Sequence, residues 1–228
     1  MLTLYTAIGH LKFQRNTNQT TTPLVINQHK EYGLTDEELI VWSCLAFQIL
    51  QIHELEDACT QRRNSLKATT ESSFKNTLNR LLLRGLVAKG EGMTGVDALY
   101  RLLGELYITP VESRFSARLF SCIHLYLTGS IKKKEFGQYL KKTYYTPMEE
   151  TILKLARAVP LSTAELVTCV KNNLHVQSNQ DVMDALYQDS DMTCKTLAED
   201  VALNHIHYPV LQAIGNLYLN KQILFQKF

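Results

Sequence analysis

The spacing of apolar residues predicts a chain built mostly of helices with a few short strands. Residues 2–13 and 24–26 have the composition of strands and lie on either side of a polar, Thr-rich stretch. After Thr35, apolar residues recur at steps of three and four, and Glu38 completes a capping box with Thr35. This pattern predicts a helix that faces the core, and a second helix follows over residues 52–63.

The third predicted helix, residues 74–84, is amphipathic. Its apolar stripe consists of Phe74, Leu78, Leu81 and Leu82. The opposite face carries Ser72, Ser73, Asn76, Asn79 and Arg80, with Lys75 and Arg84 on its flanks. Thr70 or Ser72 can cap the helix and Gly85 can end it. We therefore expect one face to be buried and a polar face to stay exposed.

A strand over residues 86–89, a glycine-rich turn at 90–92 and a short helix over 99–106 are predicted next. Residues 107–111 then have the pattern of a strand that returns beside the first one. The helix predicted over 113–128 is apolar on most sides, so it either packs within its own subunit or joins two subunits. The following basic residues are Lys132, Lys133, Lys134, Lys141 and Lys142.

The last third of the chain is predicted as a second unit. A helix begins at Pro147, and a capping box of Ser162 and Glu165 begins the next one. Three more helices are expected over 181–188, 193–202 and 206–219, and a terminal strand over 223–225. The predicted fold class is mainly α with small β wings (α+β). The predicted boundaries are a domain at 1–111, a helical linker at 112–146 and a C-terminal domain at 147–228.

Three helices followed by Leu-x-x-Arg-Gly-Leu-Val and a glycine-rich turn resemble a winged helix-turn-helix of bacterial transcription regulators, the multiple-antibiotic-resistance type. The residues that match are Leu78, Leu81, Leu82, Arg84, Gly85, Leu86 and Val87. The resemblance covers roughly residues 35–111 and implies a regulator that binds double-stranded DNA as a homodimer. Residues 147–228 resemble a second, degenerate winged helix only in their order of elements.

The charges of the chain are unevenly distributed along it. The net charge is only +2, with 24 Lys and Arg against 22 Asp and Glu. The stretch 60–89, however, contains seven basic residues against Glu71 alone, whereas residues 1–59 and 147–228 are net acidic. Segregation of this kind favours contact between the basic stretch and a polyanion.

The candidate DNA contacts all lie in that basic stretch. Asn76, Asn79 and Arg80 have side chains suited to base edges in the major groove. Ser72, Ser73 and Lys75 at the helix start suit phosphates. The expected positioning contacts are Arg62, Arg63, Lys67 and Lys89. Between Lys195 and Lys221 the second unit has no cation, so there we expect a protein partner or an effector in place of DNA.

Other classes of function are disfavoured by the sequence. The longest apolar-rich run, residues 39–50, is too short for a membrane span, and no secretory leader is apparent. Five cysteines without C-x-x-C spacing argue against a disulfide framework or a thiolate zinc site and favour the cytoplasm. His205 and His207 lack a third metal ligand at the usual spacing. Cys169 and His175 are close enough in the sequence to suggest a catalytic nucleophile pair, but Cys169 lies among apolar residues and is better explained as a core residue. No catalytic or cofactor motif is present, so we expect no enzyme and no cofactor.

Two hypotheses follow from the sequence. The first is a DNA-binding transcriptional regulator that reads the major groove with residues 72–84. The second is a winged-helix scaffold that binds partner proteins without sequence-specific DNA binding. The sequence identifies neither an operator nor an effector.

Overall fold

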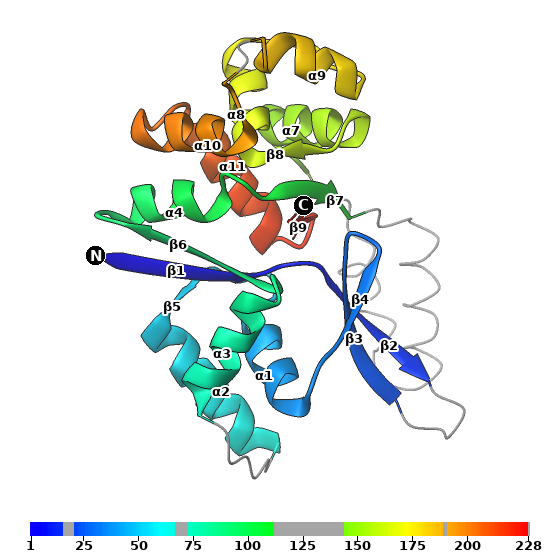
Figure 1. The fold of residues 1–228 in the computed structure, drawn as a ribbon, viewed down its shortest axis with the longest axis vertical. Coiled ribbons are helices and arrows are strands. Elements are labelled where there is room, and N and C mark those ends of the chain that lie inside the picture. Colours follow the sequence, from blue (N-terminus) through cyan, green and yellow to red (C-terminus); the bar gives the residue numbers. More distant parts are fainter. Residues whose placement is uncertain (16–20, 67–72, 112–143, 189–190, 228) are drawn as a thin grey trace.

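The fold is known from a computed structural model that describes residues 1–15, 21–66, 73–111, 144–188 and 191–227. In this part of the chain the protein is a mixed α/β structure with three small antiparallel sheets (Figure 1). The helix expected over 113–128, the lysines that follow it and the proposed dimer contact lie outside the described residues, as do Lys67 and Ser72.

The strands have the following bounds: β1 (Leu2–Ala7), β2 (His10–Arg15), β3 (Thr21–Asn27), β4 (Lys30–Gly33), β5 (Leu50–Gln51), β6 (Val87–Gly92), β7 (Tyr107–Pro110), β8 (Leu161–Ser162) and β9 (Ile223–Gln226). The helices have these: α1 (Asp36–Leu45), α2 (Ile52–Leu66), α3 (Phe74–Leu83), α4 (Gly95–Leu103), α7 (Pro147–Ala158), α8 (Thr163–Lys171), α9 (Asn179–Leu186), α10 (Cys194–Leu203) and α11 (Tyr208–Leu219).

Local signals in the sequence locate most of these elements correctly. The capping boxes of α1 and α8 are both formed: Thr35 and Glu38 bond to each other's backbone N–H, as do Ser162 and Glu165. The N-cap of α3 is Ser73, however, and not Thr70 or Ser72 as expected. The single strand expected over residues 2–13 is broken at Gly9, which has a φ of +83° and lies so close to Ile26 that a side chain there would clash with its carbonyl.

Among the described residues, two units share a core order of strand, helix, strand, helices and strand. In the first unit (residues 1–92), β1 lies between β5 and β6, and α1, α2 and α3 connect the strands. In the second unit (residues 107–227), β7 lies between β8 and β9, and its connecting helices include α7, α8 and α11. Helices α1 and α7 both begin with a Thr–Glu capping box. Within the part of the chain that the structure describes, the three-stranded sheet β2–β3–β4 has no counterpart in the second unit, and α9 and α10 have none in the first.

The prediction that the strand over 107–111 returns beside the first wing strand is wrong. Strand β7 pairs with β8 and β9 of the second unit, whereas the partner of β6 is the N-terminal strand β1. Pairing between distant segments of a chain leaves no local signal, because either strand satisfies the same backbone hydrogen bonds.

The predicted turn at 90–92 is also wrong, because these residues belong to β6. Glycines are needed here because helix α4 packs directly on β6. A Cβ at Gly90 would lie 2.3 Å from the backbone nitrogen of Leu102, and one at Gly92 would lie equally close to that of Ala98. Glycine is therefore required for close helix–strand packing and not for a bend.

Helix α4 joins the two units (Figure 1). It lies on the side of the β5–β1–β6 sheet away from α1, α2 and α3. Its buried residues Tyr100, Leu102 and Leu103 belong to the hydrophobic core of the second unit, and the Tyr100 hydroxyl donates to the carbonyl of Ile206 at 2.8 Å. The short helix expected over 99–106 is therefore present, but it spans Gly95–Leu103 and packs against both units.

Helix α11 also lies at this joint. The hydroxyl of Tyr218 is 2.9 Å from Thr6 Oγ1 and accepts the N–H of Phe47 at 3.0 Å. The Tyr218 ring packs against those of Phe47 and Phe225, with centroid distances of 5.5 and 4.5 Å. A helix of the second unit is thus anchored in the first through buried polar and aromatic contacts.

Candidate nucleic-acid interface

The exposed face of α3 brings together five of the residues expected to contact DNA. Phe74, Leu78 and Leu81 are buried in the core of the first unit, and Leu82 packs partly against it, as the apolar stripe predicted. The opposite face is exposed and carries Ser73, Lys75, Asn76, Asn79 and Arg80. The amphipathic pattern of this helix therefore correctly divides it into a packed side and a solvent side.

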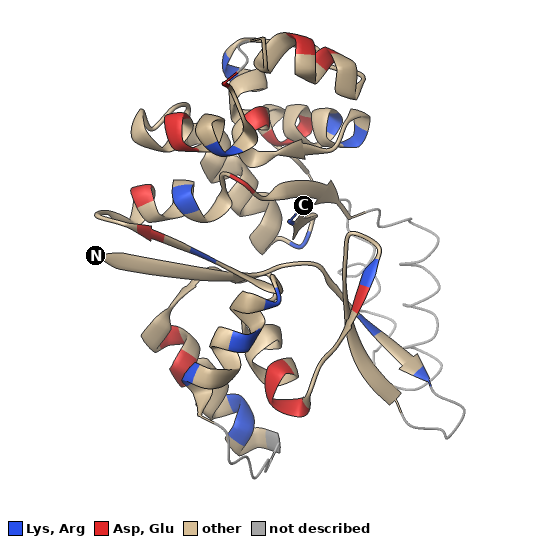
Figure 2. Cartoon of the chain, viewed as in Figure 1, with Lys and Arg blue, Asp and Glu red and all other residues tan. Residues whose placement is uncertain are grey.

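The arginines beside this face are close to acidic residues of α1. Arg80 lies 3.9 Å from Glu37 and 3.7 Å from Glu38, and its side chain remains 50% exposed. Figure 2 shows the acidic first turn of α1 next to the cations of α3. The basic stretch of the sequence is therefore partly neutralised by residues that lie more than thirty positions earlier in the chain.

Arg84 is held more firmly than Arg80. Its guanidinium donates to Glu38 Oε2 at 2.9 Å and to the carbonyl of Gly33 at 2.6 Å, and it stacks over the ring of Tyr32. Three contacts with two separate segments make this arginine a structural residue that ties α3 to α1 and β4. Arg80, with longer and more exposed ion pairs, stays available to another anion.

Glu38 is the acidic centre of this network. Burial raises the pKa of its carboxyl, but the hydrogen bonds from the Thr35 N–H and from Arg84 and the charges of Arg84 and Arg80 outweigh burial and lower that pKa. Glu38 is thus ionised at neutral pH and serves two structures, the cap of α1 and the link to α3.

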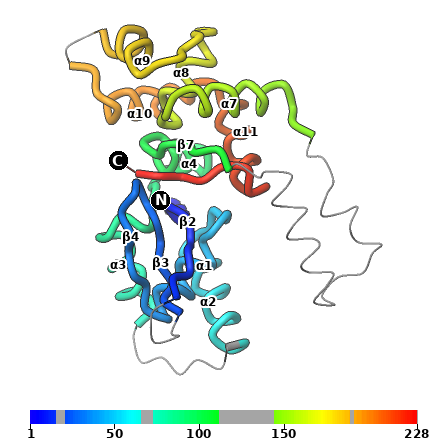
Figure 3. Tube along the Cα trace, turned by 90° about the vertical axis from the view of Figure 1, so that its right-hand side faces the viewer, coloured from blue at the N-terminus to red at the C-terminus, as the bar shows by residue number. Residues whose placement is uncertain are grey.

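Arg62 does not join the face of α3. Its Nη1 donates to Ser43 Oγ at 2.9 Å, on a different side of α1 from Glu37 and Glu38. Figure 3 shows α2 and α3 on opposite sides of the first unit. The two arginines of α2 and the polar face of α3, which the sequence grouped as one patch, are consequently separate surfaces.

Arg63 lies beside Arg62 but is less exposed. Its Nε and Nη2 atoms are buried, and no hydrogen-bond partner for them is found among the described residues. This arginine is not arranged as an outward phosphate contact.

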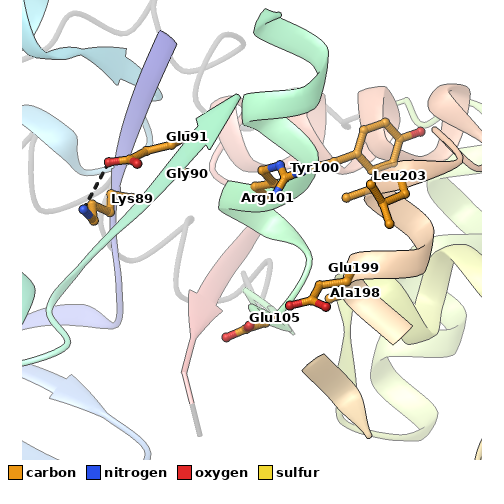
Figure 4. Close-up of a pocket in the computed structure, with 10 residues that line it drawn as sticks. Lys89, Gly90, Glu91, Tyr100, Arg101, Glu105, Ala198, Glu199 and Leu203 are labelled. Carbon is orange, nitrogen blue, oxygen red and sulfur yellow. Dashed lines mark hydrogen bonds and ion pairs between the residues drawn. The ribbon is translucent and has the colours of Figure 1, made fainter. Parts of the chain in front are cut away.

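Lys89 lies at the joint between the units. It forms an ion pair with Glu91 at 3.1 Å, and both line a pocket of about 390 Å³ between β6, α4 and α10 (Figure 4). Arg101, Glu105 and Glu199 also line this pocket, so both signs of charge are represented. Lys89 is therefore paired with an acidic neighbour and lines a pocket that contains both signs of charge.

Leu83 is the apolar member of the exposed α3 face. Its side chain is 89% exposed, and it lies at helical spacing from Asn76, Asn79 and Arg80. The sequence already marks Leu83 as an outward apolar residue in need of cover. The exposed face of α3 thus combines polar and charged side chains with one apolar side chain.

Comparisons of the chain with protein-family models, curated proteins and solved structures found no match. In the described parts of the chain, no helix combines the length and apolar character needed to cross a membrane. The same parts contain no cluster of three or more His, Cys, Asp or Glu side chains that could hold a metal ion.

The acidic partners of α3 are the residues that sequence reasoning missed. Glu37 and Glu38 were recognised as part of a helix start, and nothing in their spacing indicates that they face α3. The net negative charge of residues 1–59 is the feature of the sequence that suggests such pairing, because acidic side chains are stabilised by cations nearby in the folded protein.

Proposed function

We propose that this protein is a DNA-binding transcriptional regulator whose first unit contacts duplex DNA with the exposed face of α3. The observation that carries the proposal is the uncovered row of Ser73, Lys75, Asn76, Asn79 and Arg80 on the last helix of a small helix–sheet unit. Asparagine and arginine can each make paired hydrogen bonds to base edges, with adenine and guanine respectively.

Each residue of the face has a proposed role. Asn76, Asn79 and Arg80 read bases, and Lys75 and the helix start at Ser73 contact phosphates. Arg80 would exchange its ion pairs with Glu37 and Glu38 for DNA. The Arg80 side chain is 50% exposed and its ion pairs are longer than the 2.9 Å pair of Arg84 with Glu38, so Arg80 is the arginine that can exchange partners more easily.

The second unit is proposed to support the first and not to read DNA. Seven of the residues of α11, the helix that corresponds in order to α3, are buried: Val210, Leu211, Ala213, Ile214, Gly215, Leu217 and Tyr218. Its exposed Gln212 and Asn216 lie in a segment without cations. Such a surface would release few counterions from DNA.

A titration of DNA affinity against salt tests the general proposal. Fluorescence anisotropy with a random-sequence duplex should show affinity falling steeply between about 50 and 200 mM salt. Replacing Lys75 or Arg80 with Ala should reduce the slope of log K against log salt by about one per cation removed.

A selected duplex tests base reading. Sequences enriched from a random library should bind wild-type protein more tightly than random DNA does, and the pair Asn79→Ala with Arg80→Ala should abolish that preference. The matched control is Gln212→Ala with Lys195→Ala, an exposed amide and an exposed cation of the second unit. Equal loss in both double variants, or no DNA binding at low salt, contradicts the proposal.

A protein-interaction scaffold is the second candidate, and Leu83 is the observation that favours it. Leu83 is the last residue of α3, and its apolar side chain is 89% exposed beside the polar face, where a partner protein could cover it. Under this alternative Leu83→Ala would abolish binding of a partner protein, and α3 would not bind duplex DNA in the salt titration.

A further inference from the structure

A pocket of the second unit lies between α7, α8 and the segment that follows α8. Its volume is about 630 Å³, and small-molecule sites in proteins typically measure about 300 to 1,000 Å³. Helices α7 and α8 lie at the end of the molecule opposite α3 (Figure 1). The pocket is therefore remote from the proposed DNA face.

The backbone turn at the end of α8 forms one wall of this pocket. Asn173 adopts the left-handed conformation with a φ of +52°, and the N–H of Leu174 donates back to the last turn of α8 at 2.9 Å. This turn ends the helix and leads into residues 174–177, all four of which line the pocket. The far end of the wall is held by Asp181, whose carboxylate accepts the N–H of Gln177 at 2.8 Å.

Much of the lining is apolar. Leu155, Val170 and Leu174 pack against the core of the second unit but are only partly buried. Cys169 and Val176 also line the pocket and are buried. Burial raises the pKa of the Cys169 thiol to about 11, so at neutral pH this residue is a small uncharged part of the wall. Apolar surface that remains in contact with water favours a ligand that covers it.

The charge of the lining is one-sided. Lys154 on α7 lines the pocket, and no Asp or Glu does so among the described residues. Lys154 is exposed, and in the described ranges no ion pair with it is found. The pocket at the joint between the units, by contrast, is lined by Glu91, Glu105 and Glu199. The pocket beside α7 therefore combines an apolar wall with one cation that no protein carboxylate neutralises there.

We propose that this pocket binds a small organic anion with an aliphatic or aromatic body, whose carboxylate pairs with Lys154. The body of the ligand covers the partly exposed side chains of Leu155, Val170 and Leu174. The proposal does not depend on DNA binding, because the pocket lies at the opposite end of the molecule from α3 and ligand affinity is measured directly.

Polar groups beside the apolar wall favour an acid over other ligands. The amide side chains of Asn173 and Gln177 line the pocket and can donate to carboxylate oxygens. The His175 Nδ1 lies 3.2 Å from the carbonyl oxygen of Asn173 and donates to it, because a carbonyl can only accept. A cationic ligand is repelled by Lys154, and a neutral one leaves that charge unpaired.

Titration calorimetry of the whole protein tests the proposal with octanoate and phenylpropanoate as probes. Each acid is compared with the alcohol of the same chain, octanol or phenylpropanol, which keeps the apolar body and lacks the charge. At least one acid should bind roughly tenfold more tightly than its alcohol, because a hydrogen bond to a charged group is stronger than one to a neutral group. Added salt should weaken binding of the acid more than binding of the alcohol.

Variants of Lys154 test the role of its charge. Lys154→Gln should weaken binding of the acid roughly tenfold and leave binding of the alcohol unchanged, whereas Lys154→Arg should retain most of the affinity. The matched control is Lys171→Gln, which removes an exposed lysine at the end of α8 that does not line the pocket. Equal losses in Lys154→Gln and Lys171→Gln would mean that the net charge of the unit, and not this site, attracts the acid.

A second variant tests the apolar wall. Val170→Trp places a large side chain in the pocket and should abolish binding of the acid and the alcohol alike. Circular dichroism checks that this variant is folded. If it is not, the comparison of the lysine variants still decides the proposal, because both lysines are exposed and their replacement leaves the core intact.

Two further results would overturn the proposal. One is that neither acid binds wild-type protein at millimolar concentrations. The other is that an acid binds but loses no affinity in Lys154→Gln. The failure of the DNA proposal would look different, since it would appear in the duplex titrations and leave these affinities unchanged.

Discussion

The last helices of the two units, α3 and α11, occupy the same place in the order of elements and have opposite surroundings. Helix α3 buries one stripe and exposes the rest, including Leu83 at 89%. Helix α11 buries seven of its twelve residues, partly against the first unit. One unit thus presents its last helix to solvent, and the other uses it to hold the molecule together. A shared topology does not imply a shared surface, because burial by neighbouring elements decides what a helix can contact.

The largest expected difference between the two helices is in stability. Leu217→Ala, at a buried position of α11, should lower the free energy of unfolding by about 2 to 5 kcal/mol, because it leaves a cavity. Leu83→Ala, the same change on α3, should alter it by no more than about 0.5 kcal/mol. Denaturant unfolding of both variants checks this, and equal losses would mean that Leu83 is covered in solution.

The hydroxyl at the joint gives the next largest effect. Tyr218→Phe should lower the free energy of unfolding by about 1 to 3 kcal/mol, since the buried N–H of Phe47 loses its acceptor. Tyr208→Phe, on a more exposed tyrosine of α11, should have almost no effect. If thermal unfolding shows the two variants to be alike, the joint between the units does not depend on this hydroxyl.

The acidic link between α1 and α3 gives a smaller, pH-dependent effect. Glu38→Gln should lower the free energy of unfolding by about 1 to 2 kcal/mol at neutral pH, because Arg84 loses its charged partner. The pKa of Glu38 is lowered in the folded protein from an ordinary value of 4.5, so its contribution is present above that pH. It is lost as the pH falls through the lowered value, and the gap between wild type and variant should close there.

Glu149 in the second unit is the matched control for that measurement. It caps α7 as Glu38 caps α1, and no ion pair with it is found among the described residues. Gln can still accept the N–H of Thr146, so Glu149→Gln should cost less than Glu38→Gln. Equal costs at every pH would show that capping, and not the ion pair with Arg84, accounts for the role of Glu38.

The smallest effect on stability is expected on the proposed DNA face itself. Asn79→Ala with Arg80→Ala should change the free energy of unfolding by no more than about 0.5 kcal/mol per residue, because both side chains are exposed. A large loss of stability together with a loss of DNA binding would mean that the face is structural.

Local features of the fold were predictable because their causes are local. The capping boxes at Thr35 and Ser162 and the apolar stripe of α3 depend on residues within one or two turns of each other. The partner of β6 and the position of α4 were not predictable. Both depend on contacts between distant segments, and the glycines of β6 fit a turn as well as they fit close helix packing.

The candidate site likewise has features that depend on local sequence and features that depend on contacts between distant residues. The sequence by itself determined which side of α3 is buried and which residues remain for contact, since helical periodicity settles that. Only the tertiary structure decided that Arg62 lies apart from this face and that Glu37 and Glu38 approach Arg80. Charge and proximity act through space, so residues separated along the chain can cancel or activate one another in ways that no local pattern records.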